Sequence, residues 1–204
     1  MIAGPSGSGK STLLKLMSGV MDPDSGSLSM QKSINRRGSG YLSYVPQEPI
    51  VFLSPVVANI YSPNEGQNGI NEIAERLGVS ALLSLIQQKA WNSRKATDNF
   101  SGGQRQRLAL IRAIGSTSNI LVLDEITSAL DTENENKVLK ELLKKENKRT
   151  VILASHKLNN LLLFDRVIYL NLGQIEFDGN PHSAQQFLKA KGWMYSKSSS
   201  GKNS

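Results

Sequence analysis

Residues 4–11 read GPSGSGKS, which fits the pattern G-x-x-x-x-G-K-S. Its glycines at positions 4, 7 and 9 let backbone N–H groups approach phosphate oxygens closely. The ammonium of Lys10 is placed to reach the β- and γ-phosphates of a nucleotide, and the hydroxyl of Ser11 is placed to bind Mg²⁺. Because an apolar helix is expected at 11–18, the stretch predicts a nucleotide-binding loop rather than a chance turn.

Composition sets broad limits on the fold and the partners. The chain has 204 residues, of which 39% are hydrophobic, and this suits one globular domain with a core. It has no cysteine, which excludes disulfides and thiolate metal sites. The formal net charge is +7, but the basic residues are spread over 94–112, 137–149 and 189–202. Charge alone therefore gives weak support for nucleic-acid binding.

Hydrophobic patterns predict strands that alternate with helices. The predicted strands are 41–47, 119–125 and 150–155, followed by a hairpin over 166–179 that turns near Gly173. The predicted helices are 11–18, 70–77, one from Ser80, one opened by a capping box of Thr132 and Glu135, and one beginning at Pro181. This order predicts an α/β domain with a mostly parallel sheet.

The domain boundaries follow from the same patterns. The segment 50–114 is mostly helical and interrupts the alternation as an inserted subdomain would. We expect a core made of 1–49 and 115–191 and a helical subdomain at 50–114. The Ser- and Lys-rich tail at 192–204 is expected to be disordered.

Two acids end the predicted strand at 119–125. Ligands of α/β sheets bind at the carboxyl ends of the strands. Asp124 is therefore a candidate Mg²⁺ ligand, and Glu125 is placed to orient and deprotonate an attacking water. A helix cap or a solvated charge is the alternative for each acid taken alone, and the phosphate loop favours the functional interpretation.

A second anion site is predicted at FSGGQ, residues 100–104. Ser101 is expected to cap a helix, and Gly102 and Gly103 leave the first N–H groups of that helix uncovered. An ordinary glycine-containing helix start is the alternative. Two phosphate-binding devices in one chain make sense if the second serves the nucleotide of a partner copy.

Six motifs, taken in order, resemble those of ATP-binding cassette (ABC) ATPases. They are the phosphate loop at 4–11, Gln47, the signature at 100–104, ILVLDE at 120–125, SALD at 128–131 and His156. The resemblance implies a P-loop NTPase with a RecA-like core and an inserted α-helical subdomain. It also implies that two cassettes pair head to tail around two ATP molecules.

The resemblance gives each site residue a role. The implied catalytic residues are Glu125, His156, Gln47 and Lys10, and the implied Mg²⁺ ligands are Ser11, Gln47 and Asp124. The implied nucleotide-binding residues are Gly4, Pro5, Ser6, Gly7, Ser8, Gly9, Lys10, Ser11 and Thr12 of one cassette with Ser101, Gly102, Gly103 and Gln104 of the other. Asp131 is expected to cross the interface between cassettes.

The stretch 45–60 is similar to export-type ABC transporters through Pro49, Phe52, Asn59 and Ile60. In such exporters this region contacts a transmembrane domain, usually on the same chain. The expected function is ATP hydrolysis that powers export at the cytoplasmic face of a membrane. The expected cofactors are ATP and Mg²⁺, and the expected partners are a second cassette and a transmembrane domain, without nucleic acid.

The sequence departs from the family pattern in several places. Phe100 stands where leucine is usual, Ile126 replaces a proline or alanine, and SRKATDN at 93–99 lacks the segment with glycine and glutamate found in exporters. Family members also carry strands before the phosphate loop, with an aromatic residue that stacks on adenine. Only residues 1–3 precede Gly4, so we expect a cassette without these N-terminal strands, weakly soluble and weak in ATP binding.

Other function classes compete with an exporter. A soluble ABC ATPase acting on nucleic acid or ribosomes would usually carry a coiled coil, a zinc hook or a second cassette. A P-loop kinase or GTPase would have no use for the signature or for SALD. A catalytically dead cassette would owe its loss to truncation, because the catalytic positions are all present.

Overall fold

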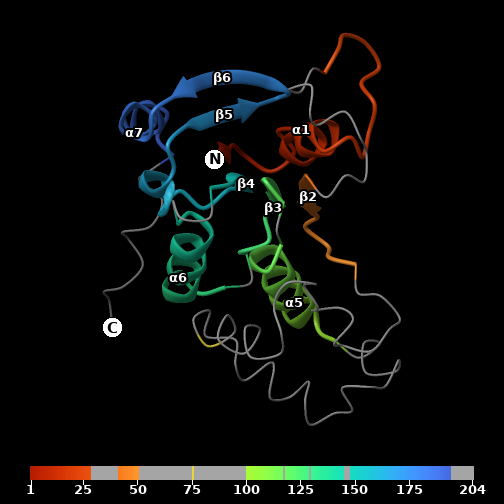
Figure 1. The fold of residues 1–204 in the computed structure, drawn as a ribbon. Helices are drawn as coiled ribbons and strands as arrows, with labels where there is room; N and C mark the ends of the chain where they lie inside the picture. The colour runs from red at the N-terminus through yellow and green to blue at the C-terminus, as the bar shows by residue number, and fades with distance from the viewer. Residues whose placement is uncertain are drawn as a thin grey trace, which may run out of the picture.

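A computed structural model describes most of the chain outside one long central segment. The described residues are 1–28, 41–50, 75, 100–116, 118–128, 130–144 and 148–193. Within them, a six-stranded sheet carries helices on both faces (Figure 1). The α/β class predicted from the sequence is confirmed.

The sheet is almost entirely parallel. Its strands are β1 (Ile2–Ala3), β2 (Leu42–Val45), β3 (Ile120–Asp124), β4 (Thr150–Ser155), β5 (Val167–Asn171) and β6 (Gln174–Gly179). They lie in the order β2-β3-β4-β1-β5-β6. Only β5 and β6 are antiparallel. Their turn, at Leu172 and Gly173 with φ values of 47° and 77°, fits the right-handed twist of the hairpin.

The α-helices lie where local signals predict them, and the structure adds one short 3₁₀ helix that the sequence did not predict. They are α1 (Lys10–Met17), α5 (Gly102–Ile114), α6 (Thr132–Leu142), the short 3₁₀ helix η4 (Leu161–Leu163) and α7 (Pro181–Ala190). Asn180 caps α7 by accepting a hydrogen bond from the Ser183 N–H at 2.9 Å, and Pro181 takes the first helical position. The helices predicted at 70–77 and from Ser80 lie outside the described residues, apart from Glu75.

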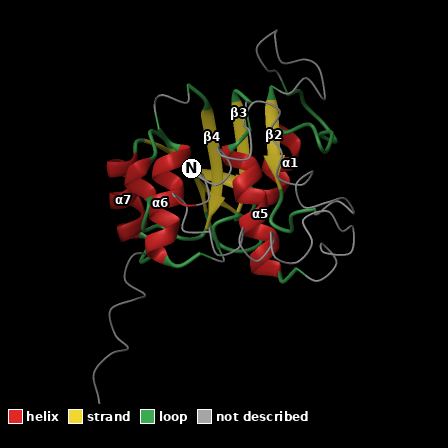
Figure 2. Ribbon diagram, turned by 60° about the horizontal axis from the view of Figure 1, so that its bottom comes forward, coloured by secondary structure: helices red, strands yellow, loops and turns green. Residues whose placement is uncertain are grey.

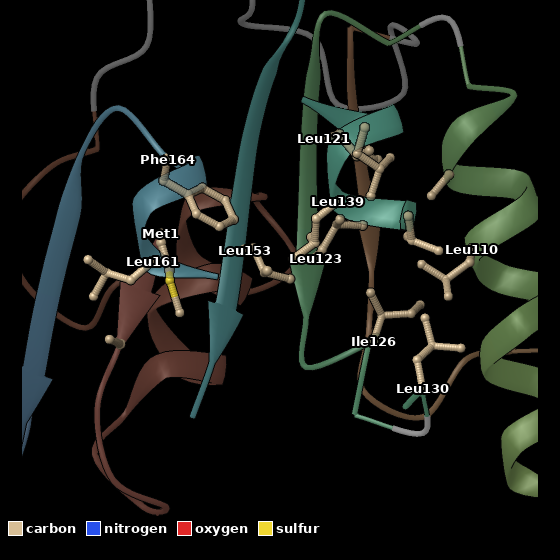
Figure 3. Packing of buried hydrophobic residues seen from close by; sticks show 14 of the residues in the cluster. Met1, Leu110, Leu121, Leu123, Ile126, Leu130, Leu139, Leu153, Leu161 and Phe164 are labelled. Carbon is tan, nitrogen blue, oxygen red and sulfur yellow. The ribbon is translucent and has the colours of Figure 1, made fainter. Parts of the chain in front are cut away.

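Strand β3 shows why the sheet needs helices on both faces. Leu121 and Leu123 belong to the larger hydrophobic cluster, with residues of α5 and α6, whereas Val122 packs on the opposite face with Leu14 of α1. Helix α1 thus covers one face, and α5 and α6 cover the other (Figures 2 and 3). A strand buried on both faces must be apolar throughout, which is the pattern seen at 120–123.

Strand β1 lies inside the sheet although it is only two residues long. Ile2 pairs with Ala154 of β4 on one side and with Ile168 of β5 on the other. Ile2 and Ala3 are both buried. Since the chain passes directly from β1 through residues 4–9 into α1, the phosphate loop lies at the carboxyl edge of the sheet.

The capping box predicted at Thr132 and Glu135 is wrong. Asp131 caps α6 instead, and its carboxylate accepts a hydrogen bond from the Asn134 N–H at 2.9 Å. Glu135 turns inward, is 1% exposed, and accepts a hydrogen bond from the Thr127 hydroxyl at 2.7 Å. Aspartate caps helices at least as well as threonine. The hydrogen bond with Thr127 holds the Glu135 side chain in the interior, so it does not reach the helix terminus.

The predicted domain boundaries stay a prediction, because most of 50–114 lies outside the described residues. Helix α5, the described end of that segment, buries Leu108 and Ile111 in the larger hydrophobic cluster. At the carboxyl end, Trp193 still packs, with its ring edge-on to Tyr169 at 5.7 Å. The predicted disordered tail lies outside the described residues from 194 onward. Among the described helices, none is both long and apolar enough to cross a bilayer.

Candidate functional site

The phosphate loop is held against β5 and opens onto the start of α1. Gly9 is the N-cap of α1 with φ of 95°, and since it has no side chain it leaves the first N–H groups of the helix uncovered. Such a helix start binds anions. A Cβ on Gly4 would lie 2.1 Å from the carbonyl oxygen of Leu170. The Gly173 N–H donates to the carbonyl of Ser8 at 3.0 Å, so the β5–β6 turn supports the loop.

Lys10 brings a positive charge to the inside of this loop. Its side chain is 5% exposed, and its Nζ donates to the carbonyls of Gly4 at 3.0 Å and Pro5 at 2.9 Å. The same Nζ lies 3.5 Å from Oε1 of Glu125. The ammonium is thus fixed between the loop and the end of β3.

A hydroxyl and a carboxylate meet next to the start of α1. The Oγ of Ser11 donates to Oδ1 of Asp124 at 3.0 Å. Tyr44 of β2 donates its hydroxyl to the other carboxylate oxygen at 3.3 Å. Burial and the negative charge of Asp124 raise the pKa of Tyr44 to about 12. Carboxylate and hydroxyl oxygens are ligands that Mg²⁺ prefers, so Ser11 and Asp124 fit the predicted metal.

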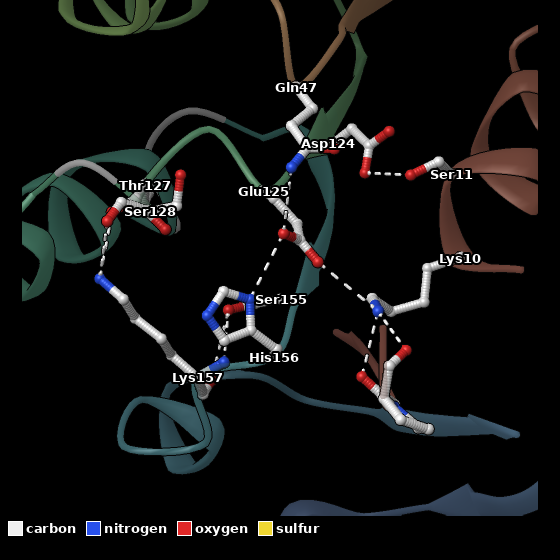
Figure 4. Close-up of polar contacts among 12 residues, drawn as sticks. Lys10, Ser11, Gln47, Asp124, Glu125, Thr127, Ser128, Ser155, His156 and Lys157 are labelled. Atoms are coloured by element: carbon white, nitrogen blue, oxygen red, sulfur yellow. Dashed lines mark hydrogen bonds and ion pairs between the residues drawn. The ribbon is translucent and has the colours of Figure 1, made fainter. Parts of the chain in front are cut away.

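Three strand ends bring side chains together around Glu125. Glu125 follows β3 with φ of 48°, and its N–H donates to the carbonyl of Ala154 at 3.0 Å. Nδ1 of His156, after β4, lies 3.3 Å from Oε2 of Glu125. Nε2 of Gln47, after β2, donates to the same oxygen at 3.5 Å (Figure 4). The sequence predicted these residues in one site, and the fold places them in contact.

The Ser101–Gln104 segment forms a well-capped helix start. The Gln104 N–H donates to the Ser101 hydroxyl at 3.3 Å, and the Ser101 N–H donates to Oε1 of Gln104 at 2.9 Å. No hydrogen bond or ion pair among the described residues joins this segment to the phosphate loop of the same chain. The cap that the sequence predicts for Ser101 is confirmed, and the roles of these residues toward a nucleotide stay predictions.

Two side chains near the site were missed by the sequence analysis. Gln106 donates its side-chain amide to the carbonyl of Gln47 at 3.4 Å and to the hydroxyl of Ser128 at 3.3 Å. Lys157 donates to backbone carbonyls that follow Glu125. Both residues lie beside recognised motifs, and only tertiary contacts distinguish them from surface residues.

Comparison with known proteins decides the family. The ABC transporter family model matches residues 1–128. The chain belongs to the ABC transporter family. The ABC membership and the P-loop NTPase fold predicted from the sequence are therefore confirmed, and with them the ATP-binding character of the domain.

Similar ABC proteins are transport components. The mesentericin transport/processing ATP-binding protein MesD of Leuconostoc mesenteroides is 34% identical over 94% of this chain and 27% of its own. The lactococcin-A transport/processing ATP-binding protein LcnC of Lactococcus lactis is 33% identical over 88% of this chain and 26% of its own. This chain thus spans about a quarter of the length of these curated relatives.

Solved ABC structures agree with the fold. The structure of a bacterial Atm1-family ABC exporter with ATP bound matches with a TM-score of 0.77 at 26% identity. The match covers 98% of this chain and 37% of that exporter. The described sheet and helices therefore have the same fold as part of that exporter.

Proposed function

We propose that this ABC cassette binds ATP with Mg²⁺, hydrolyses it, and so powers export by a membrane transporter. One observation carries the proposal. Side chains from the phosphate loop and from the ends of β2, β3 and β4 converge on the Glu125 carboxylate, with Lys10, Gln47 and His156 each within 3.5 Å of it. The names of MesD and LcnC and the exporter match support transport over action on nucleic acid.

Each residue has a chemical part in this hydrolysis. Lys10 and the N–H groups at the start of α1 bind the β- and γ-phosphates and offset their charge. Glu125 is the general base that orients the attacking water and takes up its proton. Gln47 orients that water from the opposite side. His156 donates to the γ-phosphate and stabilises the charge that develops as the bond to the leaving phosphate breaks.

The metal site follows from the oxygen donors next to α1. Ser11, Asp124 and Gln47 would hold Mg²⁺, which would offset the negative charge of the phosphates. Tyr44 acts on this site through Asp124, because its hydroxyl holds one carboxylate oxygen in place at 3.3 Å. The other oxygen accepts from Ser11, so the carboxylate is oriented before the metal binds.

The proposal includes a second cassette and a transmembrane domain. Ser101, Gly102, Gly103 and Gln104 would close the nucleotide site of the partner cassette, and Asp131 would cross the interface. The bare helix start at Gly102 supports this part of the proposal, because outside the adjoining backbone no described residue has an atom within 4 Å of a Cβ added there. We place the pair at the cytoplasmic face of a membrane. Cargo contacts in such exporters belong to the transmembrane domain, so the cassette assigns no cargo.

The test is ATP turnover by the intact protein, measured as phosphate release with and without Mg²⁺. Glu125→Gln should lower kcat by about a hundredfold or more while ATP still binds. Glu133→Gln is the matched control, because Glu133 is 80% exposed and pairs with Lys137 on the surface of α6. Unchanged turnover in Glu125→Gln, or turnover without Mg²⁺, would contradict the proposed mechanism.

A further inference from the structure

The turn after β4 sends two neighbouring side chains to different parts of the site. His156 faces Glu125, whereas Lys157 reaches the backbone beyond β3 (Figure 4). Ser155 fixes this turn, because its buried hydroxyl accepts a hydrogen bond from the Lys157 N–H at 3.0 Å. Because His156 and Lys157 are adjacent in this turn, the positions of both side chains depend on the same short piece of backbone.

The ammonium of Lys157 is surrounded by backbone carbonyls. It donates to the carbonyl of Leu130 at 3.0 Å and to those of Thr127 and Ser128 at 3.4 Å. This stretch connects Glu125 at one end to Asp131 at the other. The ammonium of Lys157 thus binds the backbone between Glu125, the proposed general base, and Asp131, which is proposed to cross the cassette interface.

The ammonium of Lys157 also pairs with a buried carboxylate. Oε2 of Glu135 lies 3.4 Å from Nζ of Lys157, and Oε1 accepts the hydrogen bond from the Thr127 hydroxyl at 2.7 Å. Glu135 is 1% exposed. A buried carboxylate is stable only when it is paired and hydrogen-bonded, so Glu135 fixes the ammonium and the start of the same backbone stretch together.

We propose that Lys157 and Glu135 are positioning residues that hold the carbonyls of Thr127, Ser128 and Leu130 against the His156 turn. Glu125, His156 and Asp131 then keep their mutual geometry during ATP hydrolysis. This inference rests on the proposed ATPase function. Among the described residues, no hydrogen bond or ion pair joins either side chain to Lys10, Ser11 or Asp124. Loss of either residue should therefore slow turnover without weakening ATP binding.

A structural explanation makes a different prediction. If Lys157 served only to neutralise the buried Glu135, then removing both charges would restore the protein. If Lys157 serves to gather the carbonyls, then Lys157→Met with Glu135→Gln would stay slow, because glutamine cannot replace the ammonium at three acceptors. The double variant separates these two roles and avoids an unpaired buried charge that would threaten folding.

The experiment compares Lys157→Met, Lys157→Arg and the Lys157→Met/Glu135→Gln double variant in the intact protein. Lys137→Met is the matched control, since Lys137 pairs with Glu133 at 2.7 Å on the exposed face of α6. Steady-state ATP turnover gives kcat, and equilibrium binding of ATP gives Kd. Hydrogen exchange of the Ser128 and Leu130 amides, which donate to Glu125 and Thr127 at 3.0 Å, reports the local backbone without any nucleotide.

We expect Lys157→Met and the double variant to lose roughly ten- to hundredfold in kcat with an ATP Kd within about twofold of the parent. Lys157→Arg should recover most of the rate, and Lys137→Met should match the parent. Exchange of the two amides should be faster in both slow variants. A double variant with parent-like kcat and exchange would overturn the inference. If the parent itself fails to hydrolyse ATP, the proposed function fails, and amide exchange alone still decides the positioning role.

Discussion

Replacing Gly4 by alanine tests how tightly the phosphate loop is seated on β5. The new Cβ would lie 2.1 Å from the carbonyl oxygen of Leu170 and 2.9 Å from Oγ of Ser8. Carbon–oxygen contacts below roughly 3.3 Å are unfavourable. Leu170 lies in β5, which is paired on both edges by β1 and β6. The loop must therefore move by about 1 Å to relieve the contact.

The expected loss of stability in Gly4→Ala has two separate causes. Overpacking of this kind costs about 1–3 kcal/mol. Gly4 also has φ of +154°, and a positive φ costs an L residue roughly 1–2 kcal/mol. We expect Gly4→Ala to lower the free energy of unfolding by about 2–5 kcal/mol. Gly26→Ala is the matched control, because its φ is +84° and, apart from its chain neighbours, no described residue has an atom within 4 Å of the added Cβ.

The assay is equilibrium urea unfolding of the parent and both variants. With a slope of about 2–3 kcal/mol per molar urea, Gly4→Ala should move the midpoint down by about 1 M or more, whereas Gly26→Ala should move it by about half as much. The difference between the two variants isolates the contact with Leu170. Equal midpoints for Gly4→Ala and Gly26→Ala would refute the reasoning, because backbone strain alone would then explain both.

Three further predictions concern single side chains. Ser101→Ala should lower stability by about 1 kcal/mol through loss of the α5 cap, which urea unfolding measures. Folding raises the pKa of Tyr44 from 10.0 to about 12. The contribution of Tyr44 to stability is therefore fully present below pH 10 and is lost as the pH rises toward 12. A phenolate absorbance step near pH 12 should be seen in the parent and should be absent in Tyr44→Phe. Arg166 lowers the pKa of Asp178 by hydrogen bonding. The stability that this ion pair contributes is therefore present above the unfolded pKa of Asp178 and is lost as the pH falls. Carboxyl NMR titration should show Asp178 ionising below the usual range. A normal Asp178 titration would contradict that ion pair.

Much of this fold could be predicted because its signals are local. The apolar run at 120–123 predicts a buried strand, since both faces of β3 contact helices. The loop at 4–11 and the acids at 124–125 sit at strand ends, where a parallel sheet brings ligand-binding residues together. Neighbouring carboxyl ends meet at one edge, so Lys10 and Glu125 are expected in one site. His156 is assigned to that site only by the family resemblance.

The missed features depend on packing between distant segments. Asp131 and Thr132 are both good helix caps, and the sequence does not show which one the backbone uses. Glu135 lies one helical turn from the cap and looks like a capping partner until the Thr127 hydroxyl and the Lys157 ammonium draw it inward. Lys157 follows His156 as an ordinary charged residue. Its role emerges only when β3 and β4 lie side by side in the sheet.

The central position of β1 has a consequence for biosynthesis. Ile2 must pair with Ala154 and Ile168, so the strand that leads into the phosphate loop has no neighbour until those residues have left the ribosome. At about 5–20 residues per second, that delay is roughly ten to thirty seconds. During this delay the apolar residues of β1 stay unpaired and can bind chaperones or pair with the wrong strands. The nucleotide site is therefore among the last parts of this cassette to form, although the phosphate loop is made well before β4 and β5.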